Sequence, residues 1–119
     1  MELVQRQDPV VAEITSAEIR DDGTTISAKA EMGRYGMVRF TLNLESSGER
    51  LGGKAYGSGR GALEDGSYVS GTFSGRWRRE GTHVVAHGID EVTNGDMSLI
   101  VFRFDARGNE VTVTHYALN

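Results

Sequence analysis

Short turn signals divide this chain at nearly regular intervals. Glycine stands beside Asp, Asn, Ser or Glu at Asp22-Gly23, Ser47-Gly48, Asp65-Gly66, Glu80-Gly81, Asn94-Gly95 and Gly108-Asn109. Glycine and asparagine tolerate a positive φ, so such pairs favour tight hairpin turns. The intervening segments are rich in Val, Ile, Thr, Phe and Tyr and lack the periodicity of a helix. The pattern predicts an all-β chain of consecutive hairpins.

The turn signals delimit about eight candidate strands. They are Val10 to Asp21, Thr24 to Met32, Gly36 to Ser46, Glu49 to Leu63, Ser67 to Arg79, Thr82 to Thr93, Met97 to Ala106 and Glu110 to Leu118. Sequential antiparallel strands most simply close into a single up-and-down β-barrel, because closure removes the edges of an open sheet. A two-sheet β-sandwich is the alternative. The length of 119 residues fits one domain, 1–119, in which we expect residues 1–9 to form a loose N-terminal arm.

Composition excludes several classes of protein. The chain has no cysteine, which rules out disulfides, thiolate nucleophiles and Cys-ligated metals, and which allows a reducing compartment. Acidic residues outnumber basic ones by 17 to 13, so the overall charge argues against a nucleic acid partner. The sequence also has neither a signal-peptide pattern nor an apolar run long enough for a membrane span. We therefore expect a cytoplasmic protein with no membrane partner.

Pairing the strands through short turns predicts which side chains face the interior. A three-residue loop, Gly33-Arg34-Tyr35, would place Ala30 opposite Val38 and Ala28 opposite Phe40. Opposed residues of an antiparallel pair point to the same face. Extending this register through the later turns predicts one inner row, composed of Gly57, Ser74, His87, Phe102 and His115.

The small residues of this row leave volume unfilled beside apolar walls, as in a ligand cavity. The predicted substrate-binding residues are Gly57, Gly59, Tyr68, Ser74, Arg76, Phe102 and Phe104, with Arg76 at the mouth binding an anionic head group.

His87 and His115 are the candidate acid–base pair, and the alternative is that both are hydrogen-bonded structural histidines. His83 and His87 on one strand would be about 13 Å apart, too far to share an ion. We expect no metal and no other cofactor.

The opposite face of the later strands is also apolar. Phe73, Trp77, Leu99 and Val101 on that face predict a subunit interface in a homo-oligomer. The same apolar face also supports an alternative function, which is that of a non-catalytic interaction or inhibitor module. This assignment depends on register, because one bulge would invert the strands that follow, place Phe73 and Trp77 in the lumen and turn the histidines outward.

Glycine-rich strands in an eight-stranded meander resemble the small barrels of the allene oxide cyclase and dirigent kind, and more distantly those of the lipocalin-like (calycin) kind. The resemblance is architectural and rests on no diagnostic motif. It implies a cavity for a small hydrophobic molecule and, in the cyclase-like case, an oligomer. The predicted function is a small-molecule-binding barrel with a mainly apolar cavity. Its catalytic form would be a cyclase, isomerase or hydro-lyase using the cavity histidines, and whether catalysis occurs stays open.

Overall fold

The computed structural model describes residues 2–46 and 48–119, and it is almost entirely β-structure. Its elements are β1 (Val4–Gln5), β2 (Val10–Arg20), β3 (Gly23–Glu31), the 3-10 turn η1 (Gly33–Tyr35), β4 (Met37–Glu45), β5 (Gly52–Ala62), β6 (Tyr68–Glu80), β7 (His83–Val92), β8 (Met97–Asp105) and β9 (Glu110–Ala117). Each predicted strand is present. Within the described residues no helix is long and apolar enough to cross a membrane.

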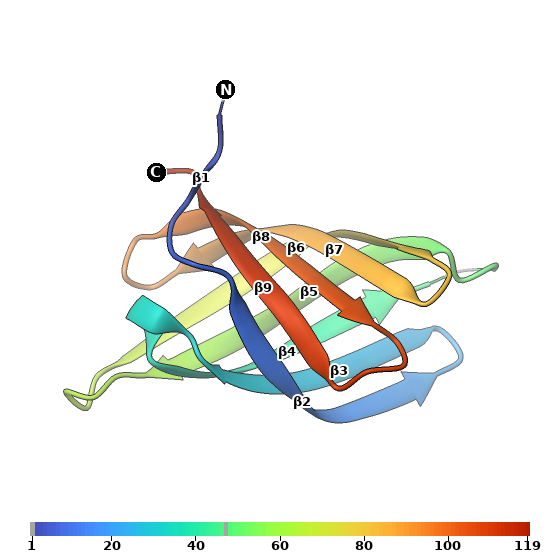
Figure 1. Ribbon diagram of the computed structural model, residues 1–119, viewed down its shortest axis with the longest axis horizontal. Coiled ribbons are helices and arrows are strands. Elements are labelled where there is room, and N and C mark those ends of the chain that lie inside the picture. Colours follow the sequence, from blue (N-terminus) through green and yellow to red (C-terminus); the bar gives the residue numbers. More distant parts are fainter. Residues whose placement is uncertain (1, 47) are drawn as a thin grey trace.

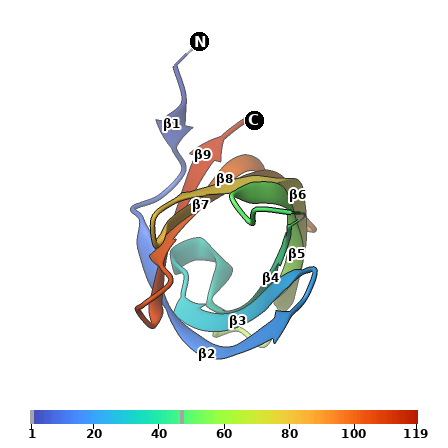
Figure 2. The ribbon, with the colours of Figure 1, turned by 90° about the vertical axis from the view of Figure 1, so that its right-hand side faces the viewer.

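Strands β2 to β9 form a closed antiparallel barrel in chain order (Figure 1). The ring closes because β9 pairs with β8 along one edge and with β2 along the other. Figure 2 looks along the barrel and shows the strands encircling the lumen. The prediction of an up-and-down barrel is confirmed, and the two-sheet sandwich is not the fold.

The N-terminal segment is docked rather than loose, contrary to the sequence prediction. In β1, Val4 pairs with Ala117 of β9. Arg6, the first residue after β1, donates its backbone N–H to the carbonyl oxygen of His115 at 2.8 Å. Its guanidinium also donates to Ser98 Oγ at 3.1 Å and to Asn119 Oδ1 at 2.8 Å. These bonds tie the arm to one end of the barrel.

The same end is covered by η1, which connects β3 to β4. Ala30 opposes Val38 and Ala28 opposes Phe40, as the three-residue loop predicted. Gly36, with φ of 73°, ends the turn and returns the chain into β4. The side chain of Tyr35 is thereby buried against the lumen.

Two turns differ from the prediction by one residue, and each inverts the strand that follows. The β5–β6 turn was expected to contain two central residues, but it has three and ends on Gly66 with φ of 88°. The β7–β8 turn likewise has three central residues and ends on Gly95 with φ of 99°. Three-residue hairpins of this kind place a left-handed glycine at the last position. The second inversion cancels the first, so only β6 and β7 are turned over relative to the prediction.

The other two late turns differ by two residues, which preserves the face. Arg76 opposes His87 where Ser74 was expected, and Ile100 opposes His115 where Phe102 was expected. At the β4–β5 connection the register differs by four residues, because Leu42 opposes Gly57 where the turn at Ser47-Gly48 predicted Gly53. The predicted turn residue Ser47 lies outside the described part of the chain.

The inversion of β6 and β7 corrects several orientations. Phe73 and Trp77 lie inside the barrel, so their prediction as outward interface residues is wrong. The alternative register, in which one bulge inverts all the later strands, therefore holds for β6 and β7 but not for β8 and β9. His115 and Phe102 face the lumen as predicted, and Leu99 lies on the outer face. Val101, the fourth residue of the predicted interface, is buried at 5% exposure and so offers no exposed contact surface.

The inner face of β5 carries only small residues, and aromatic rings from facing strands occupy the space beside it. A Cβ added at Gly57 would lie 2.6 Å from Phe73 Cζ, so the ring fills volume that was predicted to be empty. The Phe73 and Phe102 centroids are 4.8 Å apart, and those of Phe40 and Phe102 are 5.6 Å apart. This aromatic layer, Phe40, Phe73 and Phe102, crosses the middle of the lumen.

Candidate functional site

Two chambers lie in the barrel and have no lining residue in common. The inner chamber, near η1, has a volume of about 50 Å³. It is lined by Met32, Tyr35, Val38, Phe40, Gly59, Arg60, Gly61, Val69, Ser70, Gly71, Phe73, Asp90, Val92, Ile100, Phe102, Val113 and His115. The outer chamber, at the opposite end, has a volume of about 420 Å³. It is lined by Ile14, Ala17, Ile19, Arg20, Gly23, Thr24, Ile26, Leu44, Ser46, Arg50, Trp77, Arg79, Val84, Phe104, Asp105, Ala106, Gly108 and Asn109.

The outer chamber has an apolar wall. Ile26, Leu44 and Val84 contribute buried aliphatic side chains from three strands. Trp77 lies beside them and is held in place because its indole N–H donates to the carbonyl oxygen of Glu45 at 2.7 Å. A volume of 420 Å³ is within the usual range for small-molecule sites.

Charge in the outer chamber is concentrated where the strands end. Its charged lining residues are Arg20, Arg50, Arg79 and Asp105, three cations and one carboxylate. Arg20 pairs with Asp22 at 3.3 Å. Among the described residues, Arg50 and Arg79 hydrogen-bond only to backbone oxygens, at distances of 2.7 to 3.3 Å. Within that part of the chain, neither guanidinium forms an ion pair with a carboxylate.

Asp105 is the acidic group of this chamber, and its own turn holds its carboxylate. The backbone N–H of Arg107 donates to Asp105 Oδ1 at 2.9 Å. This hydrogen bond is the main reason that the pKa of Asp105 lies below its usual range. Asp105 is therefore ionised and hydrogen-bonded within its own turn. Three arginines against this one carboxylate leave the chamber lining with an excess of positive charge.

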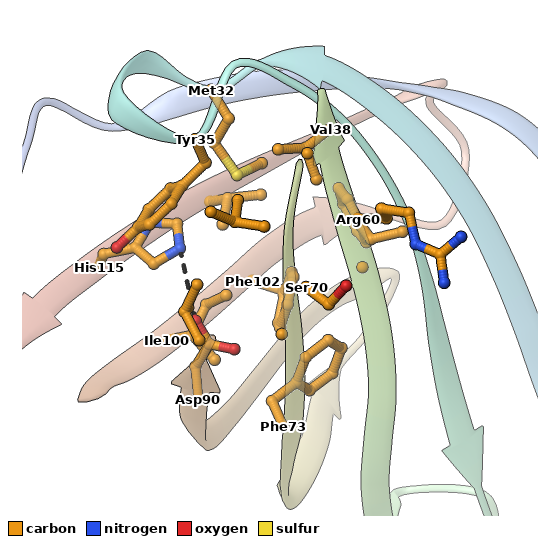
Figure 3. Close-up of a pocket in the computed structure, with 17 residues that line it drawn as sticks. Met32, Tyr35, Val38, Arg60, Ser70, Phe73, Asp90, Ile100, Phe102 and His115 are labelled. Carbon is orange, nitrogen blue, oxygen red and sulfur yellow. Dashed lines mark ion pairs between the residues drawn. The ribbon is translucent and has the colours of Figure 1, made fainter. Parts of the chain in front are cut away.

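The inner chamber brings together two buried polar groups, Asp90 of β7 and His115 of β9 (Figure 3). They are 5% and 3% exposed, and His115 Nε2 lies 4.0 Å from Asp90 Oδ2. That distance is too long for a hydrogen bond. His115 Nδ1 also has no hydrogen-bond partner in the described structure. Two buried groups with unused hydrogen-bonding capacity thus face one small space.

Burial shifts both groups towards their neutral forms. It raises the pKa of Asp90 to about 6, assisted by the negative charges of Asp96 and Glu91. Burial lowers the pKa of His115 to about 4, and the nearby Arg6 cation lowers it further while Asp96 opposes this. At neutral pH the pair is therefore a carboxylate beside a neutral imidazole.

Tyr35 closes the inner chamber beside this pair. Its ring centroid lies 5.4 Å from that of His115, and its hydroxyl donates to Asp96 Oδ2 at 2.8 Å. Burial, and then the bond to Asp96, raises the pKa of Tyr35, which keeps the phenol protonated. Arg6 and Arg34 also pair with Asp96, at 3.5 and 3.3 Å.

Asp96 stays ionised at this closed end. Burial disfavours its charged form, but the Tyr35 hydrogen bond and the two guanidinium groups outweigh burial and keep its pKa below the usual range. The network thus links the N-terminal arm, η1 and the β7–β8 turn in one cluster over the His115 side chain.

Two paired glycines form the wall of the inner chamber on β5 and β6. Gly59 opposes Gly71, and both also border a groove of about 570 Å³ on the outer side of the sheet. A Cβ at Gly71 would lie 3.1 Å from Asp90 Oδ1. The missing side chain at Gly71 therefore leaves the space directly beside the carboxyl group. The guanidinium of Arg60 points away from Asp90 and His115 in Figure 3.

The structure separates the residues that were predicted to form one site. Gly59, Phe102 and His115 line the inner chamber, whereas Phe104 lines the outer one. Gly57 lies on the inner wall, but it faces Phe73 instead of a chamber.

The remaining predicted residues are on the outer surface. Ser74, Arg76 and His87 are exposed, because the inversion of β6 and β7 turned them outward, and Tyr68 is 68% exposed. The predicted pairing of His87 with His115 is therefore wrong.

Asp90 and Tyr35 were not predicted as site residues. In β7, Val84, Ala86, Gly88 and Asp90 alternate with outward residues, so a correct register would have revealed a carboxylate in an apolar inner row. The sequence offers no comparable alternation that would identify Arg50 and Arg79, because Arg50 lies in the β4–β5 connection and Arg79 lies near the end of β6. Within residues 2–46 and 48–119, no group of three or more His, Asp or Glu side chains could hold a metal ion.

Comparisons with known proteins do not assign the chain to a family: no family model, no curated protein and no solved structure matches it.

Proposed function

We propose that the protein binds a small amphipathic anion in the outer chamber, with the apolar part of the ligand against Trp77 and its anionic group at Arg50 and Arg79. The observation that carries the proposal is the combination of a 420 Å³ apolar space with cations at its opening. Apolar burial supplies most of the affinity of such a site, and a few polar groups orient the ligand. The likeness to small ligand-binding barrels, which is one of architecture, is compatible with this role.

The position of the charges favours an anionic head over a neutral one. Arg79 donates to the carbonyl oxygen of Arg50 at 2.7 Å, so the Arg79 guanidinium is held beside the backbone of Arg50. Each guanidinium has five N–H donors, and only one or two are used in these bonds. Donors therefore remain for a carboxylate, which would accept charge-assisted hydrogen bonds from them.

The test uses Trp77, the single tryptophan of the chain, as a reporter. Decanoate is titrated below its micelle concentration, with decanol and decylammonium as neutral and cationic probes of the same chain length. We expect a saturable change in Trp emission and an affinity order of decanoate, decanol, decylammonium. The double variant Arg50→Gln/Arg79→Gln should weaken decanoate binding roughly tenfold while decanol binding is unchanged.

A matched control is Arg76→Gln, which removes an exposed arginine from the outer face of β6. It should bind decanoate as the wild type does. Calorimetric titration provides a second readout that does not depend on fluorescence. The proposal is rejected if no probe binds saturably, or if the double variant binds decanoate as tightly as the wild type.

A second candidate function, assembly through the outer surface, has its own supporting observation. Ile89, Leu99 and Tyr116 are directly opposed across β7, β8 and β9 and point outward as one apolar row. We propose that this row packs against a second copy of the chain. Sedimentation analysis should show an oligomer for the wild type and a monomer for Leu99→Arg, with Met37→Arg as the control. A monomeric wild type would reject this candidate.

A further inference from the structure

The inner chamber carries an inference that is independent of ligand binding in the outer one, because the two spaces share no lining residue. Its volume of about 50 Å³ has room for roughly four water-sized groups. Most of its lining is apolar, and its buried ionisable side chains are Asp90, His115 and Tyr35, of which Tyr35 has its hydroxyl bonded to Asp96. A buried carboxyl group and a buried imidazole nitrogen that has no hydrogen-bond partner are costly, so their presence beside a space indicates a role beyond packing.

We propose that the inner chamber is a proton-transfer site for a small carbonyl compound, with Asp90 as the general base and His115 as the hydrogen-bond donor to the carbonyl oxygen. His115 Nε2 and Asp90 Oδ2 are 4.0 Å apart and face the same space, so one small molecule lying against them can contact both (Figure 3). Gly71 leaves the room that such a molecule needs beside the carboxylate.

The reaction is an enolisation and needs no co-reactant. The Asp90 carboxylate removes a proton from the carbon next to the carbonyl group, and the electron pair of that C–H bond forms the C=C bond of the enolate. Electron density moves to the carbonyl oxygen, which an imidazole N–H of His115 stabilises. The Asp90 carboxyl proton exchanges with solvent, and return of a solvent-derived proton or deuteron to the same carbon regenerates the carbonyl compound and the Asp90 carboxylate, which completes an exchange.

The surroundings suit this division of roles. Asp90, with a pKa of about 6, is a stronger base than an ordinary carboxylate and is still ionised at neutral pH. His115, with a pKa of about 4, is neutral at that pH, so it keeps one N–H to donate and is a weaker base than Asp90. The charged groups next to the pair are Arg6, Asp96 and Glu91. Of these, Arg6 and Asp96 are paired with each other at 3.5 Å.

The test is the exchange of the methyl protons of acetone for deuterium in D₂O, followed by proton NMR with the full chain. The wild type should accelerate exchange at least roughly tenfold over Asp90→Asn. His115→Phe, which keeps a ring against Tyr35, should retain the base but lose the donor and show an intermediate rate. His87→Phe changes an exposed histidine and should exchange acetone like the wild type.

Gly71→Ala gives a second test that retains both functional groups. Its methyl group would lie 3.1 Å from Asp90 Oδ1 and occupy the space assigned to the substrate, so exchange should slow while the Asp90 carboxyl remains. This variant keeps the proposal testable if Asp90→Asn fails to fold. Equal exchange rates in wild type and Gly71→Ala, or a rate in His87→Phe as low as in His115→Phe, would overturn the proposal.

Decanoate binding separates this inference from the proposed function. Asp90→Asn and Gly71→Ala should bind decanoate like the wild type, because neither residue lines the outer chamber. Loss of exchange with intact decanoate binding supports the inner site. Loss of decanoate binding in either variant contradicts the independence of the two chambers.

Discussion

The two ends of this barrel differ in how the lumen is bounded. At one end, η1 and the N-terminal arm cover the lumen, and Asp96 holds three partners together. At the other end the strands stop around an apolar chamber bordered by arginines. The covered end buries titratable groups in a small space, whereas the open end leaves charge in contact with solvent. Burial therefore gives one end shifted pKa values and the other a large volume with cations at its rim.

The largest expected effect comes from removing the layer that divides the two ends. Phe102 is 1% exposed and touches the rings of Phe40 and Phe73. Phe102→Ala should lower the free energy of unfolding by about 3–5 kcal/mol, measured by urea denaturation. Tyr68→Ala, on an exposed side chain, should change it by less than about 0.5 kcal/mol. Similar values for the two variants would contradict the division of the lumen.

The next effect tests whether the closed end shifts Asp90 and His115 in opposite directions. Between pH 4 and 6 the folded protein holds a proton on Asp90, whereas the unfolded chain holds one on His115. The two proton counts are equal, so the pair leaves stability independent of pH in this window.

Each single variant should expose the remaining shift. In Asp90→Asn, His115 binds a proton only when unfolded, so the free energy of unfolding should rise by about 3 kcal/mol from pH 4 to 6.5, relative to the wild type. In His115→Phe, Asp90 binds a proton only when folded, so the same quantity should fall by about 3 kcal/mol from pH 4 to 6. Urea denaturation across pH measures both, and slopes of equal sign would refute the assignment.

A smaller effect addresses the cover of the closed end. Tyr35→Phe removes the hydrogen bond of 2.8 Å to Asp96. We expect a loss of about 1–2 kcal/mol in the free energy of unfolding and a higher pKa for Asp96, observed by carboxyl NMR. Tyr68→Phe is the matched control. An unchanged Asp96 pKa would show that the hydroxyl has no part in holding η1.

The smallest expected effect distinguishes His87 from His115, which the sequence analysis predicted to form an acid–base pair. His87 is exposed on β7 and opposes Arg76 on the outer face. His87→Ala should change the free energy of unfolding by less than about 0.5 kcal/mol. His115→Ala, at a buried position, should cost several times more. A large loss in His87→Ala would mean that β7 has the register first predicted.

Much of the architecture could be predicted from local patterns. Turn signals such as Asp65-Gly66 and Asn94-Gly95 marked the hairpins, and β-branched and aromatic segments marked the strands between them. These features are local, because a turn needs particular φ values and a strand needs side chains that pack on a pleated surface. Gly59, Phe102 and His115 were also placed correctly on the inner face.

The functional groupings were decided by tertiary structure. Whether a hairpin has two or three central residues sets the parity of every later strand, and that choice turned His87 outward and Asp90 inward. Arg50 and Arg79 are 29 residues apart and meet because β5 and β6 pair in a register that brings Gly52 opposite Arg78. The sequence by itself determined a chain of hairpins, since turn chemistry is local. Register and closure determined which side chains share a chamber, because both depend on how all the strands pair at once.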